Sequence, residues 1–244
     1  MISEPGIPTR TSHTTTWGAL PAAAAVLAVT ARPGQESAEL GGLLLSLRQA
    51  GASLSLLCLT RGEATAPGSG TARLEAVRPW EVQLAASILG IREVAVANYR
   101  DGRLHGYATA DLAERIDRAI RQYEPDLLLV IAPEAGDSGD AAVARAATAA
   151  AERAGVPIAG RTRPGATGSW TVKLGDNAEI IRAVQHSAVA AHASQSELLA
   201  TVIHRLDLLE DAESLRWLLF PHRTPAQRAA GDVTVGDTLA PLGG

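Results

Sequence analysis

Residues 26–36 read VLAVTARPGQE, and this stretch decides the fold class. Its first half is apolar and contains several β-branched residues, which is typical of a strand buried on both faces. Its second half, RPGQE, is a polar loop. Leucines then follow at helical spacing, at Leu40, Leu43, Leu44 and Leu47. A buried strand, a polar loop and a helix in this order predict one unit of a parallel α/β sheet.

The same alternation continues through residue 155. Helical spacing recurs at Leu112, Ile116 and Ile120, which precede the helix-stopping Pro125. Strands and helices that alternate at these separations predict an α/β fold with a Rossmann-like, doubly wound, mostly parallel sheet. The four expected strands are residues 24–31, 53–60, 94–99 and 126–133.

The pattern changes in the second part of the chain. Residues 155–173 are rich in Gly, Pro and Thr and predict a connection with one or two short strands, which include residues 169–174. An amphipathic pattern then extends from Asp176 to Leu206, with a break near Ser194. This pattern predicts a C-terminal helical extension.

The length and composition fit one domain. A chain of 244 residues, of which 46% are apolar, can bury a full core. We expect a single α/β domain over residues 22–224, a flexible N-terminal arm over residues 1–21 and a C-terminal tail over residues 225–244.

The charge pattern excludes several classes of partner. A net charge of -4, with the arginines scattered along the chain, argues against nucleic acid. No apolar run approaches the length of a membrane span, and the polar N-terminal residues do not resemble a signal peptide, so a cytoplasmic location is expected.

Cys58 is the one cysteine and predicts a buried thiol. Abundant Ala and Arg beside a single Lys suggest a bacterial source.

Six separated segments resemble, in order and spacing, the PIG-L/LmbE-like N-acetylglucosaminyl de-N-acetylases, including the mycothiol-type deacetylase fold. This family consists of zinc amidohydrolases that remove acetyl groups from N-acetylglucosamine-containing substrates. The resemblance therefore implies a metal-dependent hydrolase fold. The segments are residues 26–36, TRGE at 60–63, RPWE at 78–81, RDGRL at 100–104, residues 136–143 and AHASQ at 191–195.

The resemblance fails at the residues that carry the chemistry. Family members have Ala-His-Pro-Asp-Asp-Glu in the loop after the first strand. Its histidine and last aspartate bind zinc, and the aspartate between them is the general base. The matching residues here are Arg32, Gln35 and Gly34. A third ligand comes from a His-Pro-Asp-His segment, which matches residues 137–140 and places Asp140 at the ligand position.

These replacements remove most of what zinc needs. Arg32 has no lone pair to donate, and its charge repels a dication. Gln35 offers only a neutral amide oxygen, whereas Asp140 remains an acceptable ligand. Gly34 cannot act as a general base, a role commonly worth about 10²- to 10⁴-fold in rate. We therefore expect no metal, no cofactor and no catalytic residue at these positions.

We hypothesise that Arg32 occupies the vacated cation site and pairs with Asp140, with Asp137 and Glu36 as further partners. The alternative is that Arg32 points to solvent.

Other candidates for the pocket have two interpretations each. Arg78 matches a substrate-pocket position but could form a local pair with Glu81. Glu63 either lies near the site or caps a turn, and His192 is interpreted as a structural histidine. Asp101, in the DG loop, completes the set.

The leading interpretation is a pseudoenzyme that keeps the fold and a polar pocket lined by Arg32, Gln35, Arg78 and Asp140. Such a protein would act by binding a small polar or sugar-like ligand, or by assembly as a homo-oligomer through the helix after residue 176, or with an active paralogue.

The alternative is an active N-acetyl-sugar or thiol-conjugate deacetylase, or a lyase, with a rearranged site. Its acids, bases or ligands would be Glu36, Asp137 and Asp140.

Overall fold

The computed structural model describes residues 16–65, 71–195, 206 and 211–220. The described strands are β1 (Ala25–Thr30), β2 (Ser53–Thr60), β3 (Glu93–Tyr99), β4 (Leu127–Ile131), β5 (Ile158–Thr162), β6 (Ser169–Lys173) and β7 (Ala212–Leu219). The described α-helices are α1 (Gln35–Ala38), α2 (Gly41–Gln49), α3 (Thr71–Leu89), α4 (Thr109–Tyr123), α5 (Ser138–Ala154) and α6 (Ala178–Ala190). Short 3₁₀ turns are η1 (Glu63–Thr65), η2 (Leu104–Gly106) and η3 (Ala193–Gln195).

The strands form one sheet in the order β3-β2-β1-β4-β5-β7-β6. The pairs among β1 to β5 are parallel, and β7 is antiparallel to both β5 and β6. The order turns at β1, since β2 and β3 extend the sheet on one side while β4 and β5 extend it on the other. In open parallel sheets, ligands bind at such a turning point, outside the carboxyl ends of the strands. The loops that follow β1 and β4 are therefore the place to look for a site.

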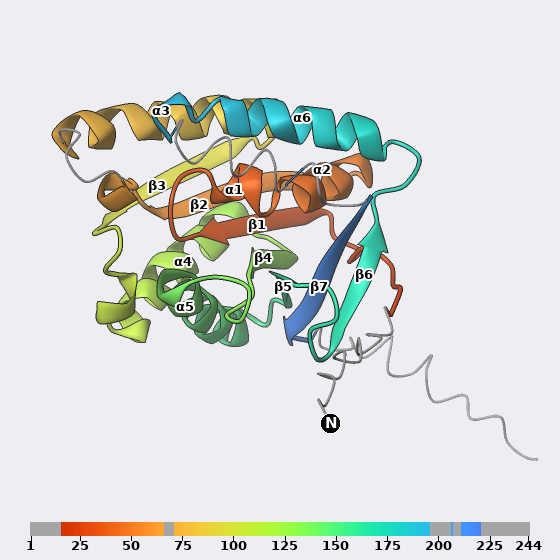
Figure 1. The fold of residues 1–244 in the computed structure, drawn as a ribbon. Coiled ribbons are helices and arrows are strands. Elements are labelled where there is room, and N and C mark those ends of the chain that lie inside the picture. Colours follow the sequence, from red (N-terminus) through yellow and green to blue (C-terminus); the bar gives the residue numbers. More distant parts are fainter. Residues whose placement is uncertain (1–15, 66–70, 196–205, 207–210, 221–244) are drawn as a thin grey trace, which may run out of the picture.

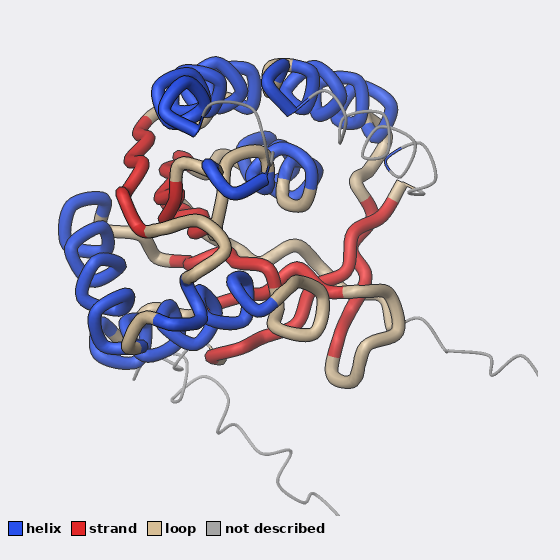
Figure 2. Tube along the Cα trace, turned by 60° about the vertical axis from the view of Figure 1, so that its left-hand side comes forward, coloured by secondary structure: helices blue, strands red, loops and turns tan. Residues whose placement is uncertain are grey.

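Helices cover both faces of the sheet. Figure 1 shows α2, α3 and α6 on one face and α4 and α5 on the other, and Figure 2 shows the same layers from a turned viewpoint. The alternating side chains of β1 explain the two cores. Val26 and Ala28 belong to the cluster under α2, α3 and α6, whereas Leu27 and Val29 belong to the cluster under α4 and α5. Because β1 has no polar face, it is buried between both layers.

The predicted α/β, doubly wound, mostly parallel sheet is confirmed. α6 ends at Ala190, close to the break expected near Ser194, and residues 196–205 of the expected helical extension lie outside the described residues. A strand that was not predicted, β7, follows at Ala212–Leu219. The strand pattern is obscured there because Glu213 is buried in β7, where Arg182 forms an ion pair with it at 2.7 Å between Nη1 and Oε1. A buried acid hides the apolar alternation that predicts a strand.

The ends of the chain are described in part. In the predicted N-terminal arm, Gly18 donates its N–H to the carbonyl of Thr171 in β6, and Thr171 donates to Thr16. Residues 1–15 and the predicted tail, residues 225–244, lie outside the described residues. None of the helices in the described part of the chain is long and apolar enough to cross a membrane.

Candidate functional site

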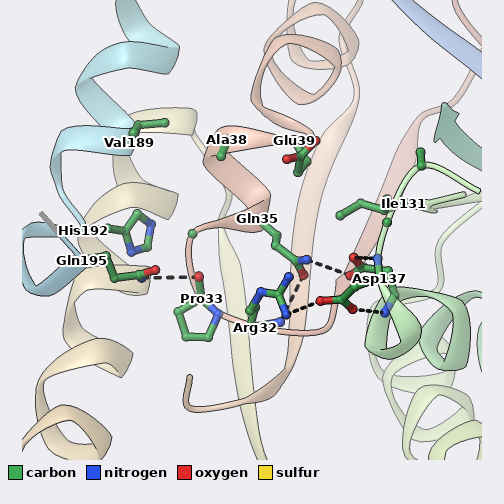
Figure 3. A pocket seen from close by; sticks show the side chains of 14 residues that line it. Arg32, Pro33, Gln35, Ala38, Glu39, Ile131, Asp137, Val189, His192 and Gln195 are labelled. Carbon is green, nitrogen blue, oxygen red and sulfur yellow. Dashed lines mark hydrogen bonds and ion pairs between the residues drawn. The ribbon is translucent and has the colours of Figure 1, made fainter. Parts of the chain in front are cut away.

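A cavity of about 310 Å³ lies at the carboxyl ends of β1 and β4. Three segments line it: the loop after β1 with α1, the loop after β4 with the start of α5, and the end of α6 with η3. Figure 3 shows Arg32 and Gln35 facing Asp137 on one side, and His192 and Gln195 on the other. The predicted positions Arg32, Gly34, Gln35, Asp137 and Asp140 all lie in this wall.

The side chain of Arg32 extends from the loop after β1 toward the loop after β4. Its Nη1 lies 2.7 Å from Oδ2 of Asp137, and neither side chain is fully buried, with exposed fractions of 32% and 48%. The hypothesis that Arg32 replaces a cation is therefore corrected in its first partner, which is Asp137 and not Asp140. Burial alone would lower the pKa of Arg32, but the hydrogen bond and charge of Asp137 raise it above its ordinary value.

Asp137 is held in place because it caps α5. Its Oδ1 accepts the N–H groups of Gly139 and Asp140 at 2.8 and 3.1 Å, and Asp140 returns the contact by accepting the N–H of Asp137 at 2.9 Å. This reciprocal capping box satisfies the free amides that begin a helix. Burial would raise the pKa of Asp137, but the Arg32 guanidinium and the two amides outweigh it and hold the pKa below its usual range.

Gln35 joins the same two loops at a deeper level. Its Oε1 accepts the backbone N–H groups of Ala31 and Arg32 at 2.9 and 3.1 Å, and its Nε2 donates to Oδ1 of Asp140 at 2.7 Å. Asp140 is only 3% exposed, and this burial raises its pKa. The side-chain amide of Gln35 thus uses its oxygen on the first loop and its nitrogen on the second.

The turn between Arg32 and Gln35 requires glycine at position 34. Gly34 has φ +94°, in the left-handed region that side chains with a Cβ rarely adopt. Its N–H donates to Oε2 of Glu36 at 2.9 Å. The position that matches the family's general base is therefore a glycine whose backbone is shaped for having no side chain.

Glu36 lies behind the cavity wall and is fully buried. It accepts hydrogen bonds from Gly34, from Oγ of Ser37 at 3.0 Å and from Nε2 of His192 at 2.6 Å. A carboxylate oxygen accepts hydrogen bonds, so the nitrogen of His192 that faces Glu36 must be the donor. The proton of the imidazole is therefore assigned to Nε2. Ser37 approaches the same nitrogen at 3.4 Å and is itself buried. The contacts among Glu36, Ser37 and His192 join the segment after α6 to the start of α1 and do not form a nucleophile-base pair, which agrees with the interpretation of His192 as structural.

The remaining predicted residues form a neighbouring network outside the cavity wall. Oε1 of Glu63 accepts the N–H of Asp101 at 2.8 Å, and Asp101 accepts the N–H of Ala64 at 3.1 Å, which closes the loop after β2. Nε of Arg78 donates to Oγ of Ser194 at 3.4 Å. Arg78 is 1% exposed, and burial lowers its pKa.

Glu81 completes this network. It accepts both the N–H and the hydroxyl of Ser194 at 2.7 Å, so Arg78 and Glu81 meet at η3. Arg78, Glu63 and Asp101, predicted as pocket residues, instead support the segment behind the site.

Two lining features were missed from the sequence. Gln195 donates to the carbonyl of Pro33 at 3.4 Å, and the AHASQ segment was its available signal. Glu39 lines the cavity and pairs with Arg161 at 2.9 Å between Oε2 and Nη1. The sequence held no signal for this pair, because its members are more than a hundred residues apart and lie outside the motifs.

The arrangement does not fit a zinc ion. Arg32 has no lone pair, and the one oxygen that Gln35 could offer already accepts two backbone N–H groups. Asp140 alone remains as a donor among the matching positions, and one ligand cannot make a tetrahedral protein site. Within the described residues, no three His, Cys, Asp or Glu side chains are grouped so that they could hold a metal ion.

Comparisons with known proteins agree with the fold described above. The family model described as PIG-L, GlcNAc-PI de-N-acetylase, matches residues 27–151. A probable N-acetyl-alpha-D-glucosaminyl L-malate deacetylase 2 of Bacillus anthracis is 30% identical over 113 residues, which cover 44% of this chain. The chain matches 50% of the length of that relative.

Two solved structures share the fold at 18% identity. The N,N'-diacetylchitobiose deacetylase of Pyrococcus horikoshii has a TM-score of 0.60, covering 83% of this chain and 87% of its own. The 4-carboxy-2-hydroxymuconate hydratase GalB of Pseudomonas putida has a TM-score of 0.63, covering 82% of this chain and 98% of its own. A deacetylase and a hydratase on one fold mean that function has to be argued from the site.

Proposed function

Because the chain belongs to the PIG-L (GlcNAc-PI de-N-acetylase) family, we propose that it is a member without zinc-dependent hydrolysis, and that it binds a small polar, sugar-like ligand in the cavity after β1 and β4. The observation that carries the proposal is the side-chain amide of Gln35. It accepts from Ala31 and Arg32 and donates to Asp140, so a hydrogen-bond bridge occupies the position of a metal ligand. The Arg32–Asp137 ion pair makes a second bridge between the same loops.

The direct test is the metal content of untagged protein purified from zinc-supplemented medium. We expect less than about a tenth of an equivalent, because an ion would have to displace both bridges. A full equivalent of zinc would refute the proposal. The matched comparison is the variant R32H/Q35D/D140H, with and without G34D, which restores the family ligands; zinc uptake by this variant but not by the natural chain would place the difference in these residues. G34D is kept separate because Asp is strained at φ +94°.

Ligand binding is a separate part of the proposal. The cavity is of the size that small-molecule sites have, and it combines apolar walls at Ile131 and Val189 with the polar groups of Arg32, Asp137 and Gln195. A ligand at about a hundred times its Kd adds about 2.7 kcal/mol of stability. A panel of neutral, acidic and basic sugars should therefore include one that raises the Tm by several degrees, and Arg32→Ala should weaken that effect. No shift with any sugar would count against binding.

Assembly is a further expectation that ligand binding does not require. A homo-oligomer, or a complex with an intact family member, would be detected by light scattering of the purified protein alone and after mixing. Alanine at Arg32 should leave the molar mass unchanged, because its side chain pairs within its own chain.

A second candidate function is favoured by one observation. The pKa of Asp137 is lowered while that of the adjacent Asp140 is raised, and carboxyl groups pushed apart in this way are typical of a base and an acid. A rearranged deacetylase or lyase could use them with Glu36 as support. It would turn over acetamido sugars or thiol conjugates, and the activity would vanish in Asp140→Ala.

A further inference from the structure

The charges around the cavity do not cancel. Arg32 is paired with Asp137, and Glu39 is paired with Arg161, so each of these pairs is close to neutral. Asp140 differs, because no cation of the described residues lies within 4.0 Å of it. Its two oxygens accept from neutral donors, the amide of Gln35 and the backbone N–H of Asp137. His192, the other titratable side chain of the wall, is paired with the buried Glu36 at 2.6 Å. The wall therefore carries at least about one negative charge in excess.

This excess charge is poorly solvated. Asp140 is 97% buried, and two hydrogen bonds use half of the about four acceptor positions of a carboxylate. A buried carboxylate without a cation is costly, so a ligand that brings a positive donor gains more here than it would in water. A bound anion would find no free cation in the described wall, because Arg32 already interacts with Asp137 at 2.7 Å and His192 with Glu36 at 2.6 Å.

We infer that the cavity selects a small hydroxyl-rich primary amine in its ammonium form over the corresponding acetamide and over an anion of the same size. The inference rests on the proposed function, since it assumes that the cavity binds a sugar-like ligand. In contrast to a site whose metal polarises an acetamide carbonyl, this wall offers Asp140 to an N–H₃⁺ group. The volume of about 310 Å³ suits a ligand of about one sugar ring.

Calorimetric titration with four monosaccharides of one size tests the inference. The probes are glucosamine, N-acetylglucosamine, glucose and glucuronate, at about pH 6.5, where an amine is protonated. We expect glucosamine to bind at least about tenfold more tightly than the other three, the effect of one charge-assisted hydrogen bond. Asp140→Asn should remove most of that preference, because it removes the charge from a side chain of nearly the same size. Its amide nitrogen would also face one of the two donors that now bond to Asp140, so the Tm of the variant is compared with that of the natural protein. Asp117→Asn is the matched control, since Asp117 pairs with Arg153 away from the cavity.

Each outcome separates the two claims. If N-acetylglucosamine, glucose or glucuronate binds as tightly as glucosamine or more tightly, the inference is overturned while ligand binding stands. If none of the four binds, both fail. If Asp140→Asn weakens glucosamine and glucose equally in a variant that melts like the natural protein, Asp140 acts through shape alone and the charge argument is wrong.

Discussion

Replacing Gln35 should test the hydrogen-bond bridge that its side chain makes between the loop after β1 and the start of α5. Gln35→Ala removes three hydrogen bonds from a side chain that is 7% exposed. It leaves two backbone N–H groups and the buried carboxylate of Asp140 without these partners. Each buried polar group left unsatisfied costs about 1–3 kcal/mol, and water entering the emptied space recovers part of that cost. We therefore expect a loss of about 2–4 kcal/mol in the free energy of unfolding.

The assay is urea unfolding, with Gln122→Ala as the control. Gln122 is exposed on α4, so its loss should change the stability by no more than about 0.5 kcal/mol. A loss below about 1 kcal/mol in Gln35→Ala, with an unchanged m-value, would refute the view that this bridge holds the two loops together.

Gln35→Glu tests the contact between position 35 and Asp140 through the pH dependence of stability. The new carboxylate would face Asp140 Oδ1 at a position where Nε2 now lies 2.7 Å away, and two carboxylates at that distance cannot both ionise. The shared proton raises the pKa of the pair in the folded state, so unfolding releases protons and the variant loses stability as the pH rises. The penalty relative to the natural protein should be larger at about pH 7 than at about pH 5. A penalty independent of pH would show that the two groups do not meet.

Three further predictions concern Asp137, Cys58 and His192. Asp137→Ala should cost about 1 kcal/mol through loss of the α5 cap, and Asp137→Asn less, because Asn also caps helices. The pKa of Asp137 is lowered in the folded protein, so its ionic contribution to stability is present above the unfolded pKa and is lost as the pH falls through the folded pKa. In urea unfolding, the stability difference between the natural protein and Asp137→Asn should therefore be smaller below about pH 4 than at neutral pH. Cys58, fully buried with its pKa raised by burial, should resist a thiol reagent in the folded protein and react in urea, and rapid labelling without denaturant would contradict its placement. His192→Ala should cost about 2–4 kcal/mol in urea unfolding, because it leaves the buried Glu36 without its 2.6 Å partner, and a neutral effect would argue against that contact.

The sequence predicted the framework because the framework is written in local patterns. The apolar run of β1 and the leucine spacing of α2 need no knowledge of distant residues, and both lie where they were expected. The strand β7 was not predictable in the same way. Glu213 is buried there because Arg182, from another element, pairs with it, and a local pattern cannot record such a partner.

The site shows the same limit at the level of single atoms. The resemblance of the two loops to family motifs predicted that Arg32, Gln35 and Asp140 share one pocket, and the structure places all three in the wall of one cavity. The sequence could not assign the pairs, because Arg32 had two carboxylates within reach along residues 137–140. The start of α5 decides the pairing. Asp137 is the N-cap of this helix and stays partly exposed at the cavity, whereas the side chain of Asp140 is buried.

The substituted positions also have to be understood as a set. In a metal site, one ion would connect the loop after β1 to the start of α5. Here, Arg32 with Asp137 and Gln35 with Asp140 make that connection through two separate contacts of 2.7 Å. Restoring histidine at position 32 alone would remove one contact and supply one ligand, while the oxygen of Gln35 stayed bonded to the backbone. No single reversal therefore rebuilds a metal site, because each residue of the set also satisfies a hydrogen bond or charge of another.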